Sequence, residues 1–77
     1  MVNHGAADYL YVQLASLLRA QIASGELPAG SQLPVLKDLA AAYDVGDMTV
    51  RKALRVLVDE GLIETRPGRG TFVRQRP

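Results

Sequence analysis

The side chains best suited to chemistry are basic and lie in the last third of the chain. Residues 51–77 carry seven basic and three acidic side chains, whereas residues 1–50 carry two basic and five acidic ones. The seven are Arg51, Lys52, Arg55, Arg66, Arg69, Arg74 and Arg76. Arginine offers a planar fork to phosphate oxygens and to the edge of guanine. The distribution of charge, more than the net charge of +1, favours a polyanionic partner, while a solvated surface with an ordinary charge excess stays open.

The sequence offers no set of residues for catalysis or for metal binding. It contains no cysteine, which excludes disulfides and thiolate metal sites. The single histidine, His4, has no carboxylate cluster beside it, and no serine is arranged with a histidine that would act as a general base. We therefore expect no enzyme activity, no cofactor and no metal.

Length and composition limit the chain to one small folded domain. It has 77 residues, of which 48% are hydrophobic and 22% charged, so it can bury one modest core. The apolar stretches are too short for a membrane span, and the N-terminus has no apolar signal-peptide core, so we expect a cytoplasmic protein. A separate ligand-binding domain does not fit, and we expect no small-molecule ligand. A complete small protein and a piece of a longer one both remain open.

A long first helix is predicted over residues 9–24. Its apolar residues recur at helical spacing and form a stripe that should face the core. The stripe consists of Tyr11, Leu14, Ala15, Leu18 and Ile22. Asp8 is expected to cap the beginning of this helix, and Gly25 is expected to end it.

Two shorter helices follow, separated by a tight turn. Helical spacing of apolar residues predicts a second helix over residues 35–43, after an extended piece at residues 32–33. Beyond the break at residues 44–46, a second set of apolar positions predicts a third helix that ends at Gly61. These positions are Val50, Ala53, Leu54 and Leu57. Two helices joined by so short a turn are typical of a helix-turn-helix.

After Gly61 the pattern changes to that of a β-hairpin. Residues 62–66 and 71–74 read as strands, and the turn formers at 67–70 lie between them. Arg66 and Arg69 would stand at the hairpin tip. The whole order predicts an α+β, mostly α fold, a winged helix-turn-helix with three helices followed by a two-stranded wing. We assign residues 9–74 to this domain, residues 1–8 to a flexible head and residues 75–77 to a tail.

This plan suits duplex DNA. The third helix would present Thr49, Arg51, Lys52 and Arg55 away from its apolar stripe, and one α-helix fits a major groove about 12 Å wide. At the wing, arginines would neutralise phosphates or reach a minor groove, and glycines would let backbone N–H groups approach phosphate oxygens. Phosphate contacts would supply most of the affinity.

From Tyr11 to Val73 the sequence also resembles the DNA-binding domain of gluconate-repressor-type (GntR) regulators. The resemblance lies in a series of short motifs that occur in one order and spacing. They are Tyr11-Val12-Gln13, the run from Ile22 to Gly30, Leu33-Pro34, the run from Thr49 to Leu54, the segment from Glu60 to Ile63, and the wing from Gly68 to Val73. Each motif is weak alone, but together they are specific.

The resemblance implies that Lys37, Thr49, Arg51, Arg69 and Gly70 contact DNA. Arg51 is the best candidate for pairing with guanine. The alternative is that Arg51 only packs its aliphatic stem or forms an i, i+4 ion pair with Asp47. The complete predicted set of DNA-contacting residues is Lys37, Asp47, Met48, Thr49, Arg51, Lys52, Arg55, Arg66, Arg69, Gly70 and Thr71.

Three positions depart from the family pattern. Val35 stands where the family has a serine that caps the second helix, and losing such a cap costs about 0.5–2 kcal/mol unless packing compensates. Asp47 stands where an arginine normally reads a base. It acts either as a first-turn acid favoured by the helix dipole or as an acceptor from a cytosine amino group. Met48 either touches a thymine methyl group or lies partly in the core.

The function that follows is a sequence-specific transcriptional regulator, with repression favoured, whose partner is double-stranded DNA. A homodimer on a palindromic operator, paired through the first helix, is a further expectation. The alternative function is a protein-interaction module that kept the scaffold but lost sequence reading, because folds do not fix functions.

Overall fold

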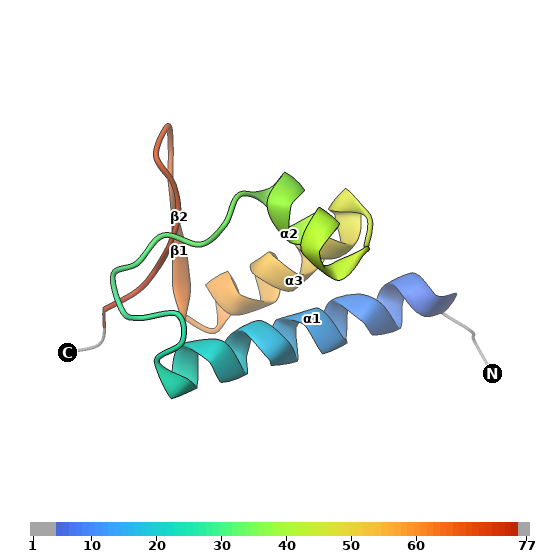
Figure 1. Cartoon of the computed structure of the whole chain (residues 1–77), viewed down its shortest axis with the longest axis horizontal. Coiled ribbons are helices and arrows are strands. Elements are labelled where there is room, and N and C mark those ends of the chain that lie inside the picture. The colour runs from blue at the N-terminus through green and yellow to red at the C-terminus, as the bar shows by residue number, and fades with distance from the viewer. Residues whose placement is uncertain (1–4, 76–77) are drawn as a thin grey trace.

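The computed structural model describes the backbone of residues 5–75 and the side chains of residues 9–75. Its elements in chain order are α1 (Gly5–Ser24), α2 (Leu36–Tyr43), α3 (Asp47–Asp59), β1 (Ile63–Arg66) and β2 (Gly70–Val73). In Figure 1, α1 runs along one side of the molecule, α2 and α3 lie over it, and the hairpin stands upright at the end of α3. The predicted fold class, a winged helix-turn-helix of the α+β type, is confirmed.

The first helix begins four residues earlier than predicted. We expected Asp8 to cap a helix over residues 9–24, but α1 starts at Gly5, so Asp8 lies within the helix and that expectation is wrong. Ala6 and Ala7 precede it, and alanine has the highest helix propensity, which extends the helix toward the N-terminus. The predicted head therefore overlaps α1 at residues 5–8, while residues 1–4 lie outside the described part.

The core lies between α1 and α3 and is closed by the hairpin. Its most completely buried side chains come from α1, α3 and the hairpin. They are Ala15 and Leu18 of α1, Val50, Ala53 and Leu57 of α3, Ile63 of β1 and Val73 of β2, each at most 2% exposed. Full burial of a leucine, isoleucine or valine side chain contributes about 1.5–3 kcal/mol. The predicted apolar stripes of the first and third helices therefore meet one another.

The turn between α2 and α3 is short because Asp44 adopts a left-handed conformation, with φ 54° and ψ 51°. The amide of Asp44 donates to Ala41 O at 3.4 Å, and the amide of Val45 donates to Ala40 O at 3.0 Å. This is the pattern of a Schellman motif, which satisfies the last carbonyl groups of a helix. It reverses the chain within three residues and brings α3 against α2.

The beginning of α2 has no side-chain cap. Val35 is the N-cap residue, with extended backbone angles, and no side chain accepts a hydrogen bond from the first turn. Its side chain is 57% exposed, so packing of Val35 compensates little for the missing cap. The helix begins at Leu36, one residue later than predicted.

The hairpin pairs β1 with β2 in antiparallel register, from Ile63 opposite Val73 to Arg66 opposite Gly70. At its tip the amide of Arg69 donates to Arg66 O at 2.9 Å, closing a β-turn with Pro67 and Gly68 at the central positions. A proline followed by a residue of positive φ, here Gly68 at 73°, is the composition of a type II turn.

A third extended segment runs beside β2. Val73 N donates to Ser31 O and Leu33 N donates to Thr71 O, both at 2.8 Å, and Gln32 forms an isolated bridge with Phe72. This segment is the predicted extended piece at residues 32–33. It connects the loop after α1 to the wing, and Figure 1 shows it as the green loop that crosses the hairpin.

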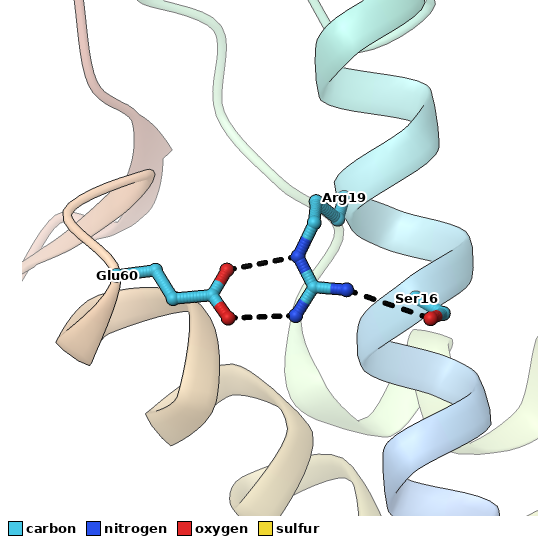
Figure 2. A network of polar contacts seen from close by, with 3 residues as sticks. All are labelled: Ser16, Arg19 and Glu60. Carbon is cyan, nitrogen blue, oxygen red and sulfur yellow. Dashed lines mark hydrogen bonds and ion pairs between the residues drawn. The ribbon is translucent and has the colours of Figure 1, made fainter.

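An ion pair joins α1 to the end of α3. Arg19 Nε and Nη2 donate to the two carboxylate oxygens of Glu60 at 2.9 and 2.7 Å, and Arg19 Nη1 reaches Ser16 Oγ at 3.4 Å (Figure 2). These hydrogen bonds lower the pKa of the Glu60 carboxyl and raise the pKa of the Arg19 guanidinium; partial burial opposes both shifts. Bidentate geometry makes this pair more specific than an ordinary surface contact.

No helix of residues 5–75 is long and apolar enough to cross a membrane.

Restoring a cap to α2 should stabilise the fold. In Val35→Ser, the hydroxyl can accept a hydrogen bond from the amide of Lys37 or Asp38, and we expect a gain of about 0.5–2 kcal/mol in the free energy of unfolding. Urea denaturation measures it. The control is Val12→Ser in the middle of α1, where a similarly exposed valine has no free amide to cap. Equal stability of Val35→Ser and the parent chain would contradict the absence of a cap.

The Arg19–Glu60 pair should make stability depend on acid pH. Because the pKa of Glu60 is lower in the folded state than in the unfolded state, its contribution is present above the ordinary glutamate pKa of about 4.3 and is lost as pH falls through the lowered value. Glu60→Gln should therefore have a lower melting temperature at pH 7, and the difference should shrink below pH 4. Glu26→Gln, a substitution of an exposed loop glutamate, serves as the control. A difference that stays constant with pH would refute this role.

Candidate nucleic-acid interface

The two faces of α3 differ sharply in exposure. Val50, Ala53 and Leu57 are completely buried against the core, while Arg51 and Arg55 are exposed. An α-helix turns by about 100° per residue, so burying the first set directs both arginines away from α1. The exposed face of α3 is therefore cationic in its middle.

A groove of about 590 Å³ lies between α3, the wing and the chain that leads into α2. Arg51 and Arg55 stand on the α3 side, and Thr65, Gly70 and Thr71 stand on the hairpin side. The remaining lining is largely apolar and comes from residues 32–36 together with Leu54, Val58 and Asp59 of α3. The groove thus brings together two of the predicted arginines and two predicted wing residues from distant parts of the sequence.

Arg51 is available to a partner. In the part of the chain that the structure describes, no ion pair or hydrogen bond engages its guanidinium, and the alternative pairing with Asp47 is not formed. Arg55 does have a neighbour, Asp59, at 3.4 Å, but the two side chains are 78% and 67% exposed. Pairs this exposed contribute little free energy, so Arg55 can exchange its carboxylate for a phosphate.

The first two residues of α3, Asp47 and Met48, are exposed to solvent. Asp47 begins the helix, and Gly46 before it provides no side-chain cap. Met48 is 64% exposed, which excludes the alternative that it lies partly in the core. A carboxylate in the first turn is favoured by the positive end of the helix dipole, whatever else it contacts.

Four predicted residues of α3 do not line the groove: Asp47, Met48, Thr49 and Lys52. Our expectation that Thr49 stands away from the apolar stripe is wrong, whereas Lys52 is exposed, as expected. Thr49 is 6% exposed because it lies one residue before Val50, on the flank of the buried stripe. Lys52 lies on that same flank, and its ammonium group is 5.7 Å from the centre of the Tyr11 ring on α1. The cation–π contact directs Lys52 toward α1.

The two arginines predicted at the wing tip differ in the contacts that their side chains make. Arg66, the last residue of β1, folds back: its guanidinium lies 4.5 Å from the centre of the Phe72 ring, and its Nε donates to Glu64 Oε2 at 2.7 Å. Arg69 is exposed in the turn, and its guanidinium has no hydrogen-bond or ion-pair partner within residues 9–75. Arg69 is therefore the cation that the tip presents.

The other predicted residues fall at separate places. Lys37 is exposed in the first turn of α2 and does not line the groove. Thr71 is half-buried on β2 and does line it. Gly70 has a φ of 123°, a conformation that strains a residue with a side chain, and a Cβ atom there would lie 2.5 Å from Gln32 Nε2 and displace it.

Sequence reasoning missed the contribution of the segment at residues 32–36. Gln32, Val35 and Leu36 line the groove, although none of them was predicted to belong to the site. The predicted extended piece at residues 32–33 was the available signal, but its strand partner, β2, is about forty residues away in sequence, and periodicity within one segment does not reveal such a partner.

Comparison with known proteins agrees with this geometry. Residues 10–73 match the family model of bacterial regulatory proteins, gntR family. The repressor MngR of the mannosyl-D-glycerate transport/metabolism system of Escherichia coli is 44% identical over 66 residues, covering 86% of this chain and 28% of the relative. The transcriptional repressor NagR of Bacillus subtilis is 44% identical over 72 residues, covering 94% of this chain and 30% of the relative. The chain thus spans about three-tenths of the length of these curated relatives.

Solved structures show the same fold. The DNA-binding domain of AraR, in complex with its operator ORR3, superimposes with a TM-score of 0.80 at 31% identity, covering 83% of this chain and 77% of that one. YtrA from Sulfolobus acidocaldarius, a GntR-family transcription factor, gives a TM-score of 0.80 at 39% identity, covering 87% and 70%. With the family model matching most of its length and the helices and wing arranged as in these structures, the chain belongs to the gntR family of bacterial regulatory proteins.

Proposed function

We propose that this chain is the DNA-binding domain of a transcriptional repressor that recognises a specific sequence in double-stranded DNA in the cytoplasm. The observation that carries the proposal is the unpaired, exposed guanidinium of Arg51 on the groove that α3 shares with the wing. The exposed face of α3 enters a major groove, and the hairpin tip lies beside it on the backbone or in the adjacent minor groove.

The roles of the residues follow from their exposure and partners. Arg51 pairs with guanine through its planar fork, while Arg55, Lys37 and Arg69 contact phosphates and fix the register of the protein on the duplex. Lys52, Thr49 and Arg66 hold the scaffold, since each is engaged or buried within the protein. The operator complex of the AraR domain supports binding of duplex DNA by this fold, and the names of MngR and NagR support repression.

Arg51→Ala should lose sequence preference more than it loses general affinity. We expect a loss of about 1–3 kcal/mol on the preferred site, concentrated at one guanine position. The measurement is selection from a pool of random duplex DNA, followed by titration of the selected site over a salt series. Parent binding should weaken steeply as salt rises, because phosphate contacts release counterions.

Lys52→Ala is the matched control, since it removes one positive charge from the neighbouring position on the other flank of α3. It should leave the selected sequence unchanged. If Lys52→Ala alters the preference and Arg51→Ala does not, the orientation assigned to α3 on DNA is wrong. If the parent chain selects no sequence even at low salt, sequence reading is absent, and the protein-interaction alternative takes its place.

We also propose that two copies bind a palindromic operator. One module reads few base pairs, and a two-fold operator doubles the sequence that is read. The outer face of α1 supports pairing through this helix, because Tyr9, Val12 and Leu17 are 63%, 51% and 49% exposed without a charged side chain among them.

Sedimentation of the chain with the selected duplex should show two protein copies per duplex. Val12→Glu should reduce the stoichiometry to one copy or weaken binding of the second, because it introduces a charge into the face that would be buried. Ala41→Glu, on the exposed surface of α2, controls for charge alone. One copy of the parent chain per duplex at saturation would rule out the dimer.

A further inference from the structure

The tip of the wing extends beyond the core. All four residues of its turn, Arg66 to Arg69, are exposed, and an isolated two-stranded hairpin is only marginally stable in water. The position of Arg69 relative to α3 therefore depends on contacts that the hairpin makes with the rest of the protein.

Backbone hydrogen bonds hold the middle of β2 but stop before the tip. Leu33 N donates to Thr71 O, and in an antiparallel ladder the next donor would be the amide two residues further along, facing the carbonyl two residues back. That pair would be Val35 N and Arg69 O. Val35 is instead the N-cap of α2, where the chain has already left the sheet.

The side chain of Gln32 supplies the donor that the backbone does not. Its Nε2 donates to Arg69 O at 3.0 Å. The opposite orientation of the amide group would place two oxygen atoms against each other, so the nitrogen must face the carbonyl. The contact requires a glycine at position 70, where a Cβ atom would lie 2.5 Å from the same nitrogen.

We propose that Gln32 is a positioning residue for DNA binding, which extends the ladder to the tip and fixes where Arg69 meets the DNA backbone. The inference rests on the proposed function. In this role Gln32 acts through Arg69: by restraining the turn before binding, it reduces the ordering that the wing must undergo on the duplex. Because the side chain is exposed, its removal should affect the wing and leave the core intact.

The test is a double-mutant cycle with Gln32→Met and Arg69→Ala on the duplex selected by the parent chain. Methionine keeps the length of glutamine but donates no hydrogen bond. We expect Gln32→Met to lower affinity about three- to tenfold, the range for loss of one hydrogen bond. In the Arg69→Ala background the same change should cost less than about twofold, because the group being positioned is gone.

Gln75→Met, at an exposed residue after β2, controls for the substitution. Unchanged affinity of Gln32→Met, or an equal loss in both backgrounds, would overturn the inference while leaving the proposed function in place. Failure of the parent chain to bind any duplex would instead count against the proposed function.

A second measurement needs no DNA. Backbone amide relaxation should show greater motion at Gly68, Arg69 and Gly70 in Gln32→Met than in the parent chain, with the amides of α1 and α3 unchanged. Equal motion at the tip in both proteins would mean that the hydrogen bond does not restrain the wing, and the inference would fall on that result alone.

Discussion

The packing of α3 against α1 is the constraint on which the other features depend. Val50, Ala53 and Leu57 have no exposed surface, and Leu18 of α1 is 1% exposed. A close-packed core of this kind admits only one rotation of α3 about its axis, since any other would bury a charged side chain or expose an apolar one. That rotation directs Arg51 outward. The reading face is thus set by residues that never touch a partner.

The packing of α3 against α1 also fixes where the wing begins. Contacts from residues distant in sequence hold the remainder of the wing. Glu60 follows directly after α3 and is clamped by Arg19, so the chain leaves α3 toward β1 in a defined direction. At the other end of the hairpin, Leu33 and Gln32 join the loop after α1 to β2 and to the turn. The position of the wing relative to α3 is therefore determined from two sides.

The sequence predicted the features that depend on residues close together in the chain, and it missed those that depend on residues far apart. Helical spacing predicted all three helices, and alternation with turn residues predicted the hairpin, because these signals lie within one segment. The Arg19–Glu60 pair spans 41 residues, and the Gln32–Arg69 contact spans 37. Periodicity carries no information on such pairs. Thr49 was misplaced for a related reason: its burial is decided by how α3 packs against the rest of the fold, and a polar residue type does not reveal it.

The number of basic residues in the last third of the chain overstates how many can serve an interface. Glu64 accepts from Arg66 at 2.7 Å and lies 3.7 Å from Arg74, while Arg66 also rests on the Phe72 ring. Moving Arg66 to a phosphate would sacrifice both contacts, whereas the more exposed Arg55 would lose only a weak pair. The wing therefore offers one readily available cation, Arg69. A tip that depends on a single arginine gains most from being held in place, because the other arginine at the tip, Arg66, is engaged by Glu64 and Phe72 and does not readily substitute for a displaced Arg69.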